Sequence, residues 1–169
     1  MLKSFGKKKP KVNPAAFVSE NAYIVGDVSI GRNSSIWPGA VLRADRFRIQ
    51  IGCNSSIQDN CVIHAGVADV IIGDNVIVGH GSVIHCARIG NNVLIGMNTT
   101  LGILAEIGDD CIIGAHSMVK DHFKIPPRSL VMGVPARIKR RITRKEIERI
   151  ISGTDFYVDL SRDFKKQGL

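Results

Sequence analysis

The chain has 169 residues, of which 44% are hydrophobic, and a formal net charge of +8. This length allows one domain with a substantial core, and the absence of any run near 18 apolar residues indicates a cytoplasmic protein with no membrane partner. The basic excess lies in residues 1–11 and 137–169, and the body between them holds slightly more acidic than basic residues. Basic ends without interleaved aromatic residues are typical of solvated surfaces, so we expect no nucleic-acid partner.

The cysteines form no CxxC pair and no evident disulfide framework. The chain has four of them, Cys53, Cys61, Cys86 and Cys111. This favours a reduced, cytosolic protein.

A six-residue period runs through most of the chain. Aliphatic residues recur six apart within the stretches 18–42, 51–63, 72–84 and 89–131, which together hold nineteen units. Glycine follows many of them, and a small or β-branched residue stands two places before each. Cys61 and Cys111 occupy this small position, which should face the core. The pattern resembles the left-handed parallel β-helix of hexapeptide repeats, an all-β solenoid in which each unit supplies one strand and one turn. An antiparallel sandwich would need turn signals every 8–12 residues, and these are absent.

The period slips three times. The step from Leu42 to the next aliphatic residue is nine residues, the step from Ile63 is nine, and the step from Ile84 is five. With three hexads per coil, all three slips leave from the same corner of the prism. Slips gathered at one corner indicate a functional site.

The repeat ends at prolines 126, 127 and 135, so we assign residues 1–137 to the β-helix and 138–169 to a C-terminal helix and tail. Thr143 and Glu146 form a capping box, and isoleucines follow at helical spacing. We predict an amphipathic helix at 144–152 or slightly longer, packed back on the prism.

Side chains near the slips fall into two columns. Arg43, His64 and His85 each follow an inward aliphatic residue and should form one outward column with members about 4.8 Å apart. Asp59 and His80 form a second column on the preceding face, with Gln58 beside it.

Five residues carry a hexapeptide coil round a corner, so His80 and His85 should lie on adjacent faces of one subunit. His64 and His85 can converge. If three prisms pack round a threefold axis, His80 of the next chain could join them, and Arg43 would fall near Asp59 across the interface.

Three stretches resemble the γ-class carbonic anhydrases: RADRFRIQIG at 43–52, SSIQDNCVIH at 55–64 and IVGHGSVIHCARIGNNVLIGMN at 77–98, with GVPARIKR extending the similarity. The resemblance implies a homotrimer with a metal at each interface, held by His64, His80 and His85. It also implies interface roles for Arg43, Asp45 and Asp59, and a hydrogen bond from the catalytic Gln58 toward the metal-bound water.

The implied reaction is the reversible hydration of CO2 to bicarbonate. Three neutral imidazoles leave a divalent metal an open position, where the pKa of a bound water falls from ~15.7 to about 7 and the hydroxide attacks CO2. Zinc is the default metal, and Fe(II) or Co would also suit three imidazoles. No organic cofactor is implied.

The sequence departs from the best-characterised branch of the family where the released proton should leave. Arg46 stands in the place of a glutamate, Ser56 replaces an asparagine, and loop 65–70 offers only Asp69. Arginine cannot shuttle protons, so we expect hydration to depend on added buffer.

Two other functions stay open on the sequence. One is a metal-bearing trimeric scaffold without catalysis. The other is a hexapeptide acyltransferase with His80 or His85 as general base, which would leave the stacked His64 unexplained. His116 and His122 lie two coils beyond the site, about 10 Å away, too far to be ligands.

Overall fold

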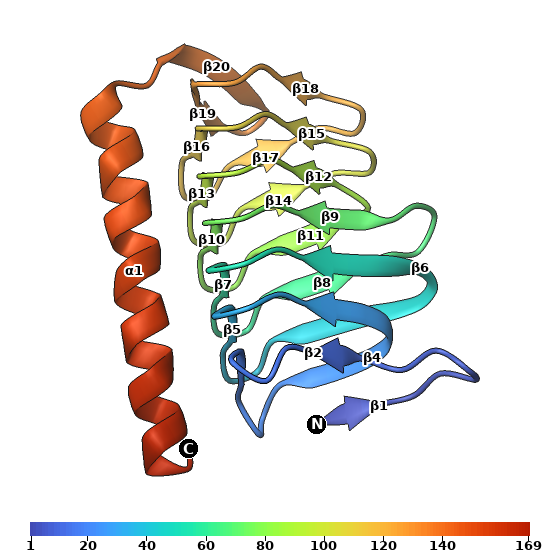
Figure 1. Cartoon of the computed structure of the whole chain (residues 1–169). Coiled ribbons are helices and arrows are strands. Elements are labelled where there is room, and N and C mark those ends of the chain that lie inside the picture. Colours follow the sequence, from blue (N-terminus) through green and yellow to red (C-terminus); the bar gives the residue numbers. More distant parts are fainter.

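The structure, a computed structural model that describes residues 1–169, is a three-sided β-solenoid with one long helix along its side (Figure 1). It confirms the predicted left-handed parallel β-helix. Every pairing between strands is parallel, apart from the hairpin β19–β20 at the end of the solenoid. The isolated bridge between Phe5 and Lys8 is also antiparallel.

The prism has three faces, and two long strands, β4 (Tyr23–Ile30) and β6 (Val41–Ile51), bend from face 1 to face 2. Face 1 also contains β1 (Leu2–Lys3), β8 (Val62–His64), β11 (Val83–His85), β14 (Thr100–Leu101) and β17 (Met118–Val119). Face 2 contains β2 (Lys11–Val12), β9 (Val70–Ile72), β12 (Arg88–Ile89), β15 (Glu106–Ile107) and β18 (Lys124–Ile125). Face 3 contains β3 (Phe17–Val18), β5 (Ser35–Ile36), β7 (Ser56–Ile57), β10 (Ile77–Val78), β13 (Leu94–Ile95), β16 (Ile112–Ile113), β19 (Ser129–Gly133) and β20 (Ala136–Arg141).

The core follows the repeat. The aliphatic residue of every unit after the first is buried, as Leu42, Ile63 and Ile84 illustrate, each with no exposed surface, and Val18 of the first unit is partly buried. Cys61 and Cys111 are also fully buried, which confirms the prediction that the small position faces inward. Burial of one aliphatic side chain contributes roughly 1.5–3 kcal/mol, and the repeat adds such a contribution at each unit.

A ladder of amide side chains joins the coils at the corner between faces 2 and 3. Each member donates through its Nδ2 to the side-chain oxygen of the next at 3.0–3.2 Å, in the order Asn33, Asn54, Asn75, Asn92 and Asp110. All have φ of 53–59°. Asparagine tolerates this left-handed conformation and satisfies its own polar groups by stacking.

We therefore expect Asn75→Ala to lower the free energy of unfolding by about 2–4 kcal/mol, since it loses two hydrogen bonds and alanine adopts a positive φ less readily than asparagine. Asn75→Gly should lose about 1 kcal/mol less, because glycine loses the same two hydrogen bonds but adopts a positive φ without strain. Urea unfolding at one fixed protein concentration measures both changes. Equal losses in the two variants would contradict the backbone contribution.

The ends of the chain differ from the sequence prediction in two respects. The basic N-terminal segment is not a free solvated tail, because β1 and β2 both pair with β4 and form the first coil. At the other end, β20 continues the sheet to Arg141, beyond the boundary placed at 137, and pairs with β19. The sequence did not predict β20, because its residues, ARIKRR, are mostly basic and show no alternation of apolar and polar residues.

The helix α1 (Arg144–Gln167) begins at the predicted capping box and runs much further than 152. It lies along face 3, over β3, β5, β7 and β10 (Figure 1). Gly153 allows this close packing, because a Cβ there would lie 3.0 Å from the Ile77 side chain. The Ser-Gly-Thr triplet at 152–154 therefore marks a contact with the prism and does not end the helix.

Hydrogen bonds from Arg140, then those from Thr143, lower the pKa of Glu146 from the usual 4.5 to about 2. Its stabilising contribution should be complete above about pH 4.5 and disappear as the pH falls toward 2, because the unfolded carboxyl binds its proton first. We expect Glu146→Gln to be less stable than the parent at pH 6 and to show a smaller loss between pH 4.5 and 2. Thermal unfolding across that range tests this, and parallel pH profiles would contradict it.

No helix of the structure has the length and apolar character needed to cross a membrane.

Candidate metal centre

The predicted column of Arg43, His64 and His85 is present and lies at the end of face 1. Parallel pairing places Arg43 beside His64 and His64 beside His85 on three successive coils. The two imidazole rings stack, with centroids 5.1 Å apart and planes 14° from parallel. All three irregular steps of the repeat leave from this corner, as predicted. The first of them forms the bend in strand β6 and is not a loop.

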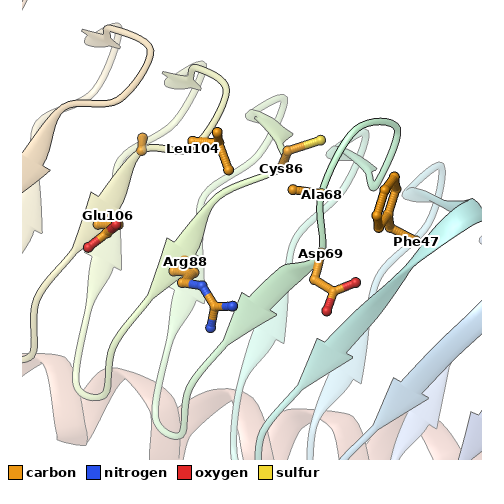
Figure 2. A pocket seen from close by; sticks show the side chains of 8 residues that line it. Phe47, Ala68, Asp69, Cys86, Arg88, Leu104 and Glu106 are labelled. Atoms are coloured by element: carbon orange, nitrogen blue, oxygen red, sulfur yellow. The ribbon is translucent and has the colours of Figure 1, made fainter.

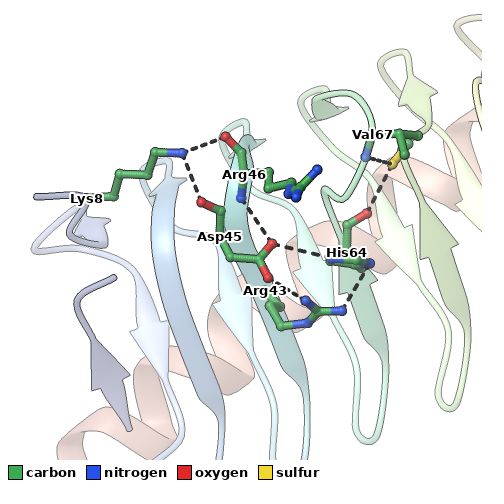
Figure 3. Close-up of polar contacts among 7 residues, drawn as sticks. Lys8, Arg43, Asp45, Arg46, His64 and Val67 are labelled. Carbon is green, nitrogen blue, oxygen red and sulfur yellow. Dashed lines mark hydrogen bonds and ion pairs between the residues drawn. The ribbon is translucent and has the colours of Figure 1, made fainter. Parts of the chain in front are cut away.

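His64 faces Arg43 and Asp45 through its two ring nitrogens, and both contacts are long (Figure 3). Its Nε2 is buried and without a hydrogen-bond partner, and the nearest carboxylate oxygen, Asp45 Oδ1, is 3.5 Å away. Its Nδ1 lies 3.3 Å from Nη2 of Arg43. Burial and the positive charge of Arg43 lower the pKa of His64, which favours the neutral ring. A neutral, incompletely partnered imidazole has the state that a metal ligand requires.

Glycine at position 66 leaves space beside that ring. A Cβ on Gly66 would lie 2.6 Å from Cε1 of His64 and 3.1 Å from Nε2. Any larger residue would displace the imidazole. The glycine was not singled out in the sequence because it lies outside the six-residue period.

His80 lies at the other corner, where the chain turns from β10 of face 3 into face 1, so the prediction that His80 and His85 lie on adjacent faces is confirmed. Its Nδ1 is 2.8 Å from Oδ2 of Asp59. A carboxylate in this position holds the ring proton on Nδ1 and leaves Nε2 with its lone pair. The side chain is 47% exposed, so this nitrogen is accessible from outside the chain.

Gln58 is buried beside His80, and its Oε1 accepts the backbone N–H of His80 at 3.1 Å. Tyr157 of α1 lies on the other side of Gln58, and burial raises the pKa of its phenol. Tyr157, Gln58 and His80 line one hollow between α1 and face 3. Tyr157 could not be found from the sequence, because the helix was predicted to end near residue 152.

No three potential ligand side chains come together within one chain. His64 and His85 lie together at the corner between faces 1 and 2, and His80 lies at the corner between faces 3 and 1. Three imidazoles would suit a divalent metal, and one of them has a buried nitrogen without a hydrogen-bond partner. Both corners border face 1.

Face 1 carries an apolar ladder between these two corners. Its members, one from each coil, are Tyr23, Val41, Val62, Val83, Thr100 and Met118, paired in register. Tyr23, Val62, Val83 and Met118 are 37–40% exposed. A continuous strip of exposed apolar residues is characteristic of a protein interface.

The acidic residues beyond the histidines are already paired. Asp69 accepts two bonds from Arg48, from the backbone nitrogen at 3.1 Å and from Nε at 3.0 Å. Glu106 pairs with Lys124 at 3.1 Å. Both carboxylates line a hollow of about 260 Å³ next to Cys86 (Figure 2). Cys86 is buried, with its Sγ 3.4 Å from the backbone nitrogen of Val67, so it fills space at this corner and does not extend outward.

Arg43 and Asp59 have partners within the chain. Arg43 binds the Asp45 carboxylate, and together with the backbone N–H of Arg46 this contact lowers the pKa of Asp45 against the opposing effect of burial. Asp59 binds His80. The expected Arg43–Asp59 pair between subunits stays a prediction.

Comparison with known families supports the hexapeptide-repeat fold. The family described as "Bacterial transferase hexapeptide (six repeats)" matches residues 9–44, 69–103 and 86–121.

Two characterised sequences and one solved structure are similar to the chain over most of its length. A "Probable carbonic anhydrase" of Methanocaldococcus jannaschii is 50% identical over 85% of this chain and 91% of its own. The "Carnitine operon protein CaiE" of Escherichia coli K12 is 39% identical over 89% of this chain and 78% of its own. A crystal structure from Bacillus cereus, described as a putative acetyltransferase, has 35% identity and a TM-score of 0.96, covering 99% of this chain and 98% of that one.

Proposed function

The chain belongs to the γ-class carbonic anhydrases, a family of hexapeptide-repeat β-helix proteins, and on that premise we propose that it is a metal-dependent homotrimer that hydrates CO2 reversibly to bicarbonate. The observation that carries the proposal is the division of three imidazoles between two corners. His64 and His85 are stacked at one corner, and His80 is oriented by Asp59 at the other.

A threefold assembly would bring these corners together. Both border face 1, so packing the apolar ladders of three chains round an axis would place His80 of one subunit next to His64 and His85 of another. Burial of four half-exposed apolar side chains per chain favours such an assembly. The partner would then complete a site that one chain cannot form.

We propose that His64, His80 and His85 hold zinc, with Fe(II) or cobalt as alternatives. Bound there, the metal would lower the pKa of a coordinated water from ~15.7 to about 7 and supply the nucleophile for CO2 at neutral pH.

Arg43 must leave the His64 ring for that ring to bind a metal. A guanidinium only donates, so Arg43 facing Nδ1 places the ring proton on Nε2. His64 would present a free lone pair to a metal only after this proton had moved to the other ring nitrogen or Arg43 had withdrawn from Nδ1. Asp59 of the neighbouring subunit is the carboxylate expected to receive Arg43, which would couple assembly to metal binding.

Gln58 would hold His80 in place by accepting its backbone N–H, and only the amide N–H groups of Gln58 would then be left for the predicted contact with the reacting water. Position 46 is an arginine and Asp69 is bound by Arg48, so neither position offers a free carboxylate to the product proton. We expect the proton to leave to small buffer molecules.

Anaerobic purification with metal analysis, followed by stopped-flow CO2 hydration at several buffer concentrations, tests the proposal. We expect one metal per chain and a rate that increases with buffer concentration. A protein without bound metal, or one that binds metal and shows no hydration in any buffer, would refute the enzymatic proposal; the second result would assign a metal-bearing scaffold.

An acyltransferase is the second candidate, and the Bacillus cereus structure described as a putative acetyltransferase favours it. In that case His80 or His85 would act as general base. Metal-independent consumption of acetyl-CoA would favour this function, but it would leave the stacked, neutral His64 without a role.

A further inference from the structure

The bend of β6 leaves backbone carbonyls without partners in the sheet. Pairing with β4 and β8 stops at Ala44 and Arg43, and pairing with β4 and β9 resumes at Ile49. Residues 45–48 therefore lie between the two registers. Their polar backbone groups need other partners, and this is the segment that carries Asp45.

Lys8 supplies the missing donor. It lies in the N-terminal turn, residues 4–10, between the two short strands that pair with β4. Its Nζ is 3.0 Å from the carbonyl oxygen of Asp45 and 2.5 Å from that of Arg46 (Figure 3). Lys8 is half-buried, whereas Lys7 and Lys9 on either side are exposed.

Asp45 and Arg46 also make the contacts that lead to His64 in the histidine column. The backbone N–H of Arg46 donates to Oδ1 of Asp45 at 3.0 Å, and Arg43 holds the other carboxylate oxygen. Oδ1 of Asp45 is also the carboxylate atom that faces His64 Nε2. A chain of contacts thus runs from the Lys8 ammonium through the backbone at 45–46 and the Asp45 carboxylate to the His64 ring.

We propose that Lys8 is a positioning residue of the metal site, through which the N-terminal turn holds the Asp45 carboxylate beside the His64 ring. This inference rests on the proposed metal function, but its first test does not require metal. The basic N-terminal segment would then help to position a ligand of the metal site.

Lys8→Met keeps the aliphatic stem and removes the ammonium, and Lys8→Arg restores a donor. Lys7→Met and Lys9→Met are matched controls that lose the same charge without these contacts. In the full-length, metal-free protein we expect the imidazole nitrogen NMR signals of His64 to move in Lys8→Met, to return toward the parent in Lys8→Arg, and to stay unchanged in both controls. The signals of His116 and His122 should not respond.

Zinc affinity, measured by competition with a chelator, should fall about tenfold in Lys8→Met, at the lower end of what loss of a group supporting a ligand produces. Unchanged His64 signals would overturn the proposal, as would wild-type zinc affinity in Lys8→Met. If the parent protein binds no zinc, the proposed function fails, and the NMR result alone still decides the role of Lys8.

Discussion

His85→Ala should bind zinc more than about 100-fold more weakly than the parent and lose CO2 hydration by at least the same factor. Loss of a residue that only supports a ligand costs 10–100-fold in metal affinity, so loss of a ligand should cost more. His85 is the sharpest choice because its ring contacts His64 by stacking and forms no ion pair whose loss would complicate the result. Metal analysis after dialysis and stopped-flow kinetics measure the two effects.

His116→Ala is the matched control, since His116 is exposed and remote from the histidine column. It should retain full metal content and activity. Equal metal content in His85→Ala and His116→Ala would contradict the assignment of His85 as a ligand, whatever the activity of either protein.

The double variant Val62→Asp/Val83→Asp should convert the proposed trimer to monomers and remove its metal, although neither residue is a ligand. Both side chains are 38–40% exposed on face 1, with Ile63 and Ile84 carrying the core beside them, so the fold should survive. Assembly would bury six unpaired carboxylates round the axis. Because each costs several kcal/mol, we expect association weaker by more than about 1,000-fold.

Sedimentation velocity, circular dichroism and metal analysis together test this expectation. Phe156→Asp is the control, because Phe156 is a large apolar residue on α1, 60% exposed and away from face 1. It should remain trimeric and metal-bound. A double Asp variant that stays trimeric would show that face 1 is not the interface.

Within the repeat, the face and column of each residue could be predicted from the sequence. Counting three hexads per coil placed Arg43, His64 and His85 in one column and His80 on an adjacent face, and strand register confirms both. The prediction succeeded because every coil repeats the same backbone geometry. Position along the chain then converts directly into position on the prism.

The parts that could not be predicted depend on segments that leave the repeat. Lys8 reaches residues 45–46 because of the path of a seven-residue turn, and Tyr157 reaches Gln58 because the helix continues past Gly153. Asp59 and His80 lie together, as predicted for the second column, but the ion pair between their side chains was not predicted. These contacts are set by individual side-chain reach and packing, which carry no periodic signal.

Mixed trimers test the shared site most directly. One chain carries His80→Ala and the other carries His64→Ala with His85→Ala, so that neither forms a metal site in its own homotrimer. If His64 and His85 of one subunit act with His80 of the next, every mixed trimer has one intact site among its three interfaces. The two chains are co-expressed with different tags, and mixed trimers are purified on both tags. We expect one metal per mixed trimer and CO2 hydration. Mixed trimers without metal would contradict a site divided between subunits.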